Sequence, residues 1–185
     1  LFKPKSKNTP KLIQNLLILG GSLGAKKINK TIAKIKTPLN IWHQTGAKHN
    51  EEVKLMYDKD IHPSLKIEDF IEDMAEAYAW ADIVICRAGA STLSELAACG
   101  IASILIPFPF AVDNHQMKNA QYLSNNGAAV LVEEDQLSVD ILKQILLEFF
   151  NTPELLIQMA MKARKLSKPD ATDNVAKLCV EASYA

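Results

Sequence analysis

The segment LLILGGSLGA, residues 16–25, runs from an apolar strand pattern through a glycine turn into a helix pattern. Two later segments repeat this order, DIVICRAGASTLSE at residues 82–95 and SILIPFPFAVDNHQ at residues 103–116. In a parallel sheet, strand ends and the following helix N-termini meet at one edge, where free N–H groups and helix dipoles attract anions. The three turns therefore predict a sheet edge that binds a ligand carrying phosphate groups.

Strand and helix patterns alternate along most of the chain. Apolar runs predict six strands, at residues 15–19, 40–44, 65–68, 83–86, 103–106 and 129–132. Helices are predicted at residues 25–36, 50–57, 71–80, 92–98, 114–125, 138–150, 153–166 and 171–183. This repeat is typical of an α/β fold with a doubly wound, Rossmann-like parallel sheet of about six strands and, here, two extra C-terminal helices.

Length and composition favour a single domain. The chain has 185 residues, of which 48% are hydrophobic, enough for one sizeable core. We expect residues 1–11, with their lysines and prolines, to be a linker or disordered terminus, and residues 12–185 to form the domain. The sequence has no apolar run long enough to span a bilayer and no leader pattern, so we expect a soluble, cytoplasmic protein.

Cysteine usage and charge exclude several kinds of site. Cys86, Cys99 and Cys179 are odd in number and widely spaced, and we expect reduced, buried thiols. No metal site is expected, because no His, Cys or acidic cluster has ligand spacing. Formal net charge is zero, but residues 1–50 hold ten lysines and no acidic residue.

The basic N-terminal part could contact nucleic acid, anionic lipid or a ligand phosphate. The favoured interpretation is that the lysines lie on the solvated face of one amphipathic helix, while Ile28, Ile32 and Ile35 on its other face turn toward the sheet. The lysines of this face are Lys26, Lys27, Lys30 and Lys34. No nucleic acid partner is expected, because no aromatic residues are interleaved with these lysines. An anionic membrane surface stays open as a partner.

The first turn contains GGSLGA, which lacks the first glycine of the dinucleotide fingerprint, since Leu19 stands there. Gly20 and Gly21 allow a sharp turn, Ser22 offers a hydroxyl, and the amides of residues 23–25 can meet an oxyanion. The alternative is that the glycines only permit close packing of helix on strand.

In the second turn, Gly89 interrupts the regular pattern after the strand. Residues 90–92 then supply small side chains and hydroxyls at a helix N-terminus, and these groups suit the binding of a diphosphate. Glu95, one turn further, can accept hydrogen bonds from ribose hydroxyls. The alternative is an ordinary capping box, formed by Ser91 with Ser94 or by Thr92 with Glu95.

In the third turn, Asp113 is predicted to cap the next helix, on which His115 and Asn119 share a face beside Gln116. These groups could hydrogen-bond a sugar, or they are surface residues without a role. A serine hydrolase is disfavoured because GASTL is not the G-x-S-x-G elbow.

These turns resemble the donor-binding half of the MurG family. The resemblance also includes IWHQTG at residues 41–46, the long stretch at residues 70–100 and DNHQMKNA at residues 113–120. These enzymes are the bacterial undecaprenyl-diphospho-muramoylpentapeptide β-N-acetylglucosaminyltransferases. The resemblance covers about residues 15–175. It implies a hexosyltransferase with two Rossmann-like domains that transfers N-acetylglucosamine from UDP to a lipid-linked muramoyl-pentapeptide during peptidoglycan synthesis, on the inner face of the plasma membrane.

The resemblance also implies a role for each turn, without cofactor or metal. The donor diphosphate would lie against Gly21, Ser22 and Gly24. The backbone of Ile71 would read the uracil edge, and Glu95 would hold the ribose. The remaining implied contacts are Ala90, Ser91 and Thr92 with the diphosphate and nucleoside, and His115 and Gln116 with the N-acetylglucosamine.

Two features of the family are missing from this chain. The glycine-rich loop with the proposed catalytic histidine, and the surface for the lipid acceptor, belong to an N-terminal domain, and no arginine precedes the donor domain in residues 1–11. We therefore expect no catalytic residue here, weak donor binding and no transfer by the chain alone. The alternatives are an enzyme similar to UDP-N-acetylglucosamine epimerase and a non-catalytic nucleotide-binding module.

Overall fold

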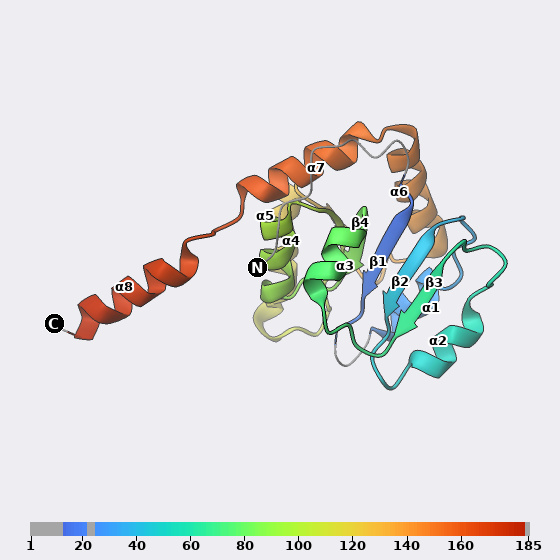
Figure 1. The fold of residues 1–185 in the computed structure, drawn as a ribbon, viewed down its shortest axis with the longest axis horizontal. Helices are drawn as coiled ribbons and strands as arrows, with labels where there is room; N and C mark the ends of the chain where they lie inside the picture. Colours follow the sequence, from blue (N-terminus) through green and yellow to red (C-terminus); the bar gives the residue numbers. More distant parts are fainter. Residues whose placement is uncertain (1–12, 22–24, 184–185) are drawn as a thin grey trace.

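Six parallel strands form one sheet, in the order β3-β2-β1-β4-β5-β6, in the computed structural model, which describes residues 13–21 and 25–183 (Figure 1). The strands are β1 (Asn15–Leu19), β2 (Asn40–Gln44), β3 (Leu65–Glu68), β4 (Ile83–Cys86), β5 (Ala102–Leu105) and β6 (Val130–Leu131). This confirms the doubly wound sheet, and β1 to β4 have the predicted bounds. The strand order reverses between β1 and β4, where ligands bind in open α/β sheets. Residues 1–11, expected to be a linker, lie outside the described residues.

Eight α-helices and a short 3-10 helix (Val112–Asn114) belong to the described part of the chain. The helices are α1 (Lys26–Ile32), α2 (Asn50–Met56), α3 (Met74–Trp80), α4 (Ala90–Cys99), α5 (His115–Asn125), α6 (Val139–Asn151), α7 (Glu154–Lys165) and α8 (Ala171–Ser183). The predicted start of α3 at residue 71 was wrong. Asp73 accepts a hydrogen bond from the amide of Glu76 at 2.8 Å and so caps the helix three residues later.

Alternate side chains of the strands enter two apolar layers, one on each face of the sheet. In β1, Leu16 and Ile18 join the layer beneath α1, α2 and α6, whereas Leu17 and Leu19 join the layer beneath α3, α4 and α5. A parallel strand that is covered on both faces has a nearly continuous apolar sequence, and this is why the position of β1 was predictable. Ile28, Ile32 and Ile35 are buried on the first face, which confirms their predicted orientation.

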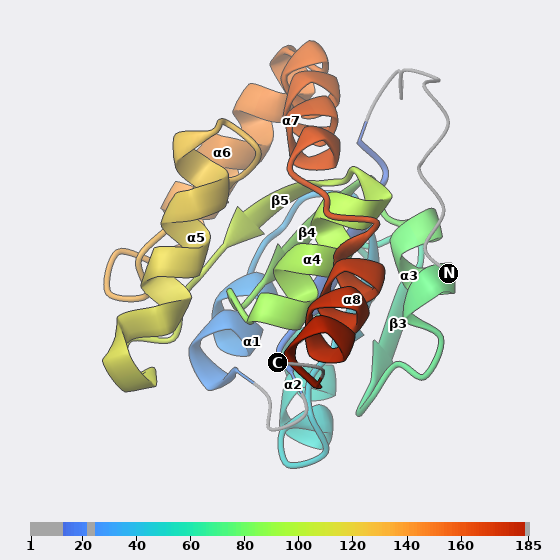
Figure 2. The same cartoon turned by 90° about the vertical axis from the view of Figure 1, so that its left-hand side faces the viewer.

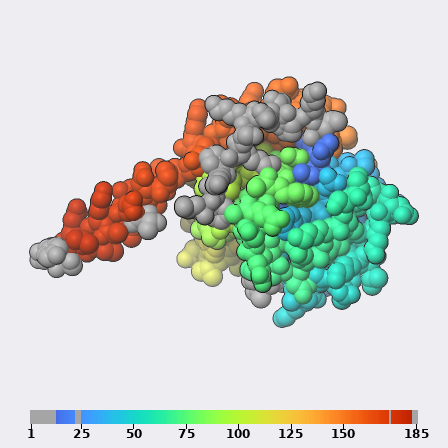
Figure 3. Space-filling view, viewed as in Figure 1, coloured from blue at the N-terminus to red at the C-terminus, as the bar shows by residue number. Residues whose placement is uncertain are grey.

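The C-terminal helices differ in their contact with the sheet. Helix α7 packs against the end of α4, where a Cβ on Gly100 would lie 3.1 Å from that of Arg164. Helix α8 extends away from the body of the molecule (Figures 1 and 3), so that it stands in front of α4 when the view is turned by 90° (Figure 2). Val175, Leu178 and Val180 on this helix are exposed.

The structure also tests the predictions about cysteine. The Cys86 and Cys99 side chains are buried, as predicted, but the prediction of burial was wrong for Cys179, which lies exposed on α8. Burial raises the pKa of the Cys86 thiol to about 12, so this group stays neutral. In the described ranges, no helix combines the length and apolar character that crossing a bilayer requires.

Candidate functional site

The three turns lie side by side at the carboxyl edge of the sheet. Leu19 at the end of β1 pairs with Cys86 at the end of β4, and Cys86 pairs in turn with Leu105 at the end of β5. Gly20, Arg87 and Ile106 therefore begin three neighbouring exits at the point where the strand order reverses. The predicted convergence of the turns is confirmed.

In the first turn, the two glycines have different roles. The amide of Gly20 donates to the carbonyl of Gln44 at 3.1 Å, and a Cβ here would lie 3.0 Å from the amide nitrogen of Ala25. Gly20 thus permits close packing, as the alternative interpretation held. Gly21 has a φ of 76°, which favours glycine, and a Cβ on it would meet no atom within 4 Å among the described residues. Ser22 and Gly24 lie outside the described residues.

A buried network of polar side chains lies next to this turn. Asn29 donates through Nδ2 to the carbonyl of Thr45 at 2.9 Å, so its Oδ1 accepts from Nε2 of His43 at 3.1 Å. The other ring nitrogen of His43 accepts from the hydroxyl of Tyr57 at 2.8 Å. Burial lowers the pKa of His43 to about 3. The imidazole is therefore neutral, and the network ties α1 and α2 to the end of β2.

In the described part of the chain, the second turn presents backbone amides without hydrogen-bond partners. Gly89 precedes α4 without a side-chain cap, and the first helical bond runs from the amide of Leu93 to the carbonyl of Gly89 at 3.0 Å. The amides of residues 90–92 lie before this bond and have no partner in the helix. The capping boxes considered for Thr92 and Ser91 are not formed, because the helix begins at Ala90.

Glu95 is held one turn into α4 by a tyrosine from α3. The Tyr78 hydroxyl donates to Glu95 Oε2 at 2.8 Å, and the Tyr78 side chain is buried. Burial, and in second place neighbouring groups including Glu95, raise the pKa of Tyr78, so the phenol keeps its proton and remains a donor. Among the residues that the structure describes, Oε1 of Glu95 has no hydrogen-bond partner and can accept further hydrogen bonds. Tyr78 was not predicted as a site residue, since an apolar helix position carries no signal for this contact.

Ile71 follows β3 at the same edge of the sheet, and its side chain is buried. Within residues 13–21 and 25–183, neither its amide nor its carbonyl makes a hydrogen bond. Both backbone groups can therefore pair with the edge of a base.

Helix α5 begins one residue later than predicted. Asp113 is not its cap, because Asp113 and Asn114 have φ values of 50° and 55°, and the chain turns through both before the helix starts. His115 donates from Nδ1 to the carbonyl of Val112 at 2.7 Å, which leaves Nε2 of the exposed ring as an acceptor. Gln116 Oε1 accepts from the amide of Phe108 at 3.0 Å, so its NH₂ group can face a ligand.

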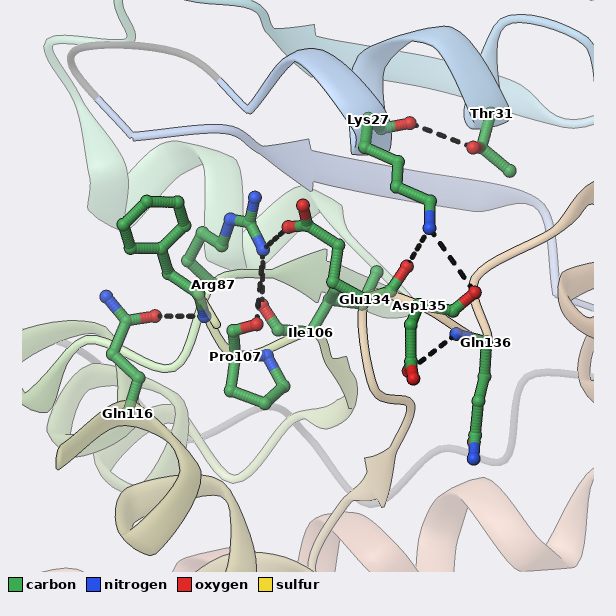
Figure 4. A network of polar contacts seen from close by, with 10 residues as sticks. Lys27, Thr31, Arg87, Ile106, Pro107, Gln116, Glu134, Asp135 and Gln136 are labelled. Carbon is green, nitrogen blue, oxygen red and sulfur yellow. Dashed lines mark hydrogen bonds and ion pairs between the residues drawn. The ribbon is translucent and has the colours of Figure 1, made fainter. Parts of the chain in front are cut away.

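A further pair of charged residues joins the strand exits. Arg87 directly follows β4 and forms an ion pair with Glu134 from the turn after β6 (Figure 4). Neither residue was predicted from the sequence as part of the site. A charge immediately after the buried run Ile83–Cys86 would have been a signal for Arg87, whereas nothing in the local sequence marks Glu134.

Comparison with known proteins identifies the family of this domain. A family model described as the glycosyltransferase family 28 C-terminal domain matches residues 15–175. The chain belongs to this family. The match includes all three turns, and it confirms the class that the resemblance implied.

The relatives of this family 28 domain include UDP-N-acetylglucosamine–N-acetylmuramyl-(pentapeptide) pyrophosphoryl-undecaprenol N-acetylglucosamine transferases. The one from Vesicomyosocius okutanii is 46% identical over 176 residues, which are 95% of this chain and 50% of the relative. The one from Stutzerimonas stutzeri is 45% identical and covers 91% and 49%, respectively. The chain thus spans about half the length of the curated relatives it matches.

Solved structures support the fold. The crystal structure of Acinetobacter baumannii MurG matches with a TM-score of 0.83 and 38% identity, over 93% of this chain and 51% of that one. The glycosyltransferase VinC, solved with dTDP, matches with a TM-score of 0.67 and 18% identity, over 97% and 44%. The second likeness concerns the fold alone. The expected similarity to MurG is confirmed.

Proposed function

We propose that this family 28 domain binds UDP-N-acetylglucosamine at the edge formed by the three turns. It would act as the donor-binding half of a transferase that passes N-acetylglucosamine to a lipid-linked muramoyl-pentapeptide in peptidoglycan synthesis. The relatives named above, which are N-acetylglucosamine transferases, support this choice of donor and acceptor. The full-length enzyme would work on the inner face of the plasma membrane, where its lipid acceptor lies.

In this proposal, the first two turns share the diphosphate, the third turn contacts the sugar, and Ile71 after β3 contacts the base. The diphosphate lies against the unpaired amides of residues 90–92 and against Gly21, where an anion is favoured by the N-terminus of α4. The backbone of Ile71 pairs with the uracil edge. His115 and Gln116 reach the N-acetylglucosamine, while the roles of Ser22 and Gly24 on the diphosphate stay predictions.

The observation that carries the proposal is the position of Glu95. A carboxylate cannot bind phosphate, yet Glu95 stands one turn behind the amides of residues 90–92 and keeps Oε1 available beside the bond from Tyr78. An anion site followed by a fixed acceptor suits a nucleoside diphosphate better than inorganic phosphate, because ribose hydroxyls can donate to the carboxylate.

Transfer to the acceptor needs a group that positions or deprotonates the attacking hydroxyl. No residue of this chain is proposed for that role, and we assign the base and the acceptor surface to the other half of the full-length enzyme. His115 offers a free ring nitrogen, but we place it beside the donor sugar.

Calorimetric titration of the chain with UDP-N-acetylglucosamine, UDP and ADP at millimolar concentration tests the proposal. We expect UDP-N-acetylglucosamine to bind most tightly, UDP more weakly and ADP at least about tenfold more weakly than UDP, since backbone groups discriminate the base edge. Equal binding of ADP and UDP, or no binding of the UDP compounds, would contradict it. Proton NMR of the same mixtures should show no epimerised sugar, which separates this function from that of an epimerase.

A further inference from the structure

The turn after β6 contacts the exits of β4 and β5, although it contains none of the expected site residues. Glu134 in this turn forms the ion pair with Arg87, and the two side chains are only 18% and 16% exposed. The same nitrogen of Arg87, Nη1, donates to the carbonyls of Ile106 at 3.2 Å and Pro107 at 3.3 Å (Figure 4). Glu134 therefore fixes a guanidinium that holds the start of the third turn.

The third turn depends on such side-chain contacts. The last backbone bond between β4 and the exit of β5 runs from the amide of Ile106 to the carbonyl of Cys86 at 2.9 Å. Pro107 and Pro109 then provide no N–H group to continue the ladder. Phe108 is held through its amide by Gln116, and its ring centre lies 5.3 Å from the guanidinium carbon of Arg87. Arg87 thus contacts this turn through both backbone carbonyls and an aromatic ring.

The main chain around Glu134 is itself anchored to the helix that follows the first turn. Lys27 on α1 donates through Nζ to the carbonyl of Glu134 and, at 3.4 Å, to that of Asp135. Figure 4 shows Lys27 reaching down from α1 to this turn, on the side opposite Arg87. The carboxylate of Glu134 is therefore held relative to both α1 and the sheet.

Arg87 has two possible relations to a bound donor. If it were a phosphate ligand, Glu134 would compete with the ligand for its charge. If Arg87 instead supports the third turn, Glu134 neutralises its charge and keeps Nη1 bonded to the carbonyls of Ile106 and Pro107. The two carbonyls that accept hydrogen bonds from Nη1, together with the ion pair between Glu134 and the same nitrogen, favour the support.

We propose that Glu134 is a positioning residue of the donor site: it acts through Arg87 to hold residues 107–116 in the conformation that presents Gln116 to the donor sugar. The inference rests on the proposed function for the identity of the sugar. It assigns to the turn after β6 a role in discriminating the nucleotide-sugar from the free nucleotide.

The test compares Glu134→Ala with Glu133→Ala, which removes an exposed carboxylate from the preceding position. Calorimetry of the full chain should show that Glu134→Ala weakens UDP-N-acetylglucosamine binding about five- to tenfold and UDP binding less than about twofold. Glu133→Ala should change neither. Glu134→Gln, which keeps an oxygen facing Arg87, should recover most of the lost affinity.

A second measurement needs no ligand. Amide hydrogen exchange in residues 108–116 should be faster in Glu134→Ala than in Glu133→Ala, while exchange in β1 and β4 is unchanged and shows that the variant is folded. Unchanged exchange in residues 108–116 would overturn the positioning role, and so would tighter UDP binding by Glu134→Ala, which would make Arg87 a phosphate ligand restrained by Glu134. If the unmodified chain binds no UDP compound, the proposed function fails, and the exchange experiment still decides the role of Glu134.

Discussion

Replacing Glu95 with alanine is expected to weaken UDP-N-acetylglucosamine binding by about 10- to 150-fold, or about 1.5 to 3 kcal/mol. The carboxylate would lose the hydrogen bonds from the ribose hydroxyls, and bonds to a charged group have this magnitude. Calorimetry gives the affinity, and thermal unfolding of the same sample gives the stability.

Tyr78 provides the control for this substitution. Glu95→Ala also leaves the buried Tyr78 hydroxyl without its 2.8 Å acceptor, which is expected to lower stability by about 1 to 2 kcal/mol. Tyr78→Phe removes this bond while the carboxylate stays, and it should change donor affinity less than about threefold. A Glu95→Ala protein with a lower melting temperature and an affinity within twofold of the unmodified chain would reduce Glu95 to a structural partner of Tyr78.

His43 gives the second large effect, a loss of stability in acid. Its pKa is about 3 in the folded protein against 6.5 as the ordinary value, so between these pH values the unfolded chain binds a proton that the folded chain does not. The stabilising contribution is therefore complete above pH 6.5 and decreases as the pH falls toward 3, by on the order of 3 to 5 kcal/mol in total.

Urea unfolding at a series of pH values between 7.5 and 4.5 measures this effect. His43→Gln, which cannot titrate, should show a clearly smaller decrease in the free energy of unfolding over this range. Parallel pH profiles for the His43→Gln and unmodified proteins would contradict the assignment of a neutral, buried His43.

The sequence was sufficient to predict the sheet because its central strands are buried on both faces. β4 is an uninterrupted apolar run, β1 is one after its first residue, Asn15, and the limits of both strands were predicted to the residue. The convergence of the turns followed from the parallel order alone. The family resemblance, which the family 28 match bears out, then related these turns to a nucleotide-sugar.

Predictions failed where a single side chain or backbone angle decides a boundary. Helix α4 begins at Ala90 because Gly89 adopts an extended conformation as its cap, so the capping boxes further along are not used. The contacts of Tyr78 with Glu95 and of Arg87 with Glu134 join residues far apart in the sequence. Strand and helix periodicity predicts which face a residue occupies, but not which partner meets it there.

The central claim is that the donor binds at the edge where the strand order reverses. An NMR titration of the isotopically labelled chain with UDP-N-acetylglucosamine tests it most directly, because each backbone amide reports separately. We predict the largest shifts at the amides of Gly21, Ile71 and residues 90–92, with smaller ones at Phe108 and Gln116. Shifts confined to the groove along α1, lined by Lys26, Lys30 and Lys34, would contradict the account.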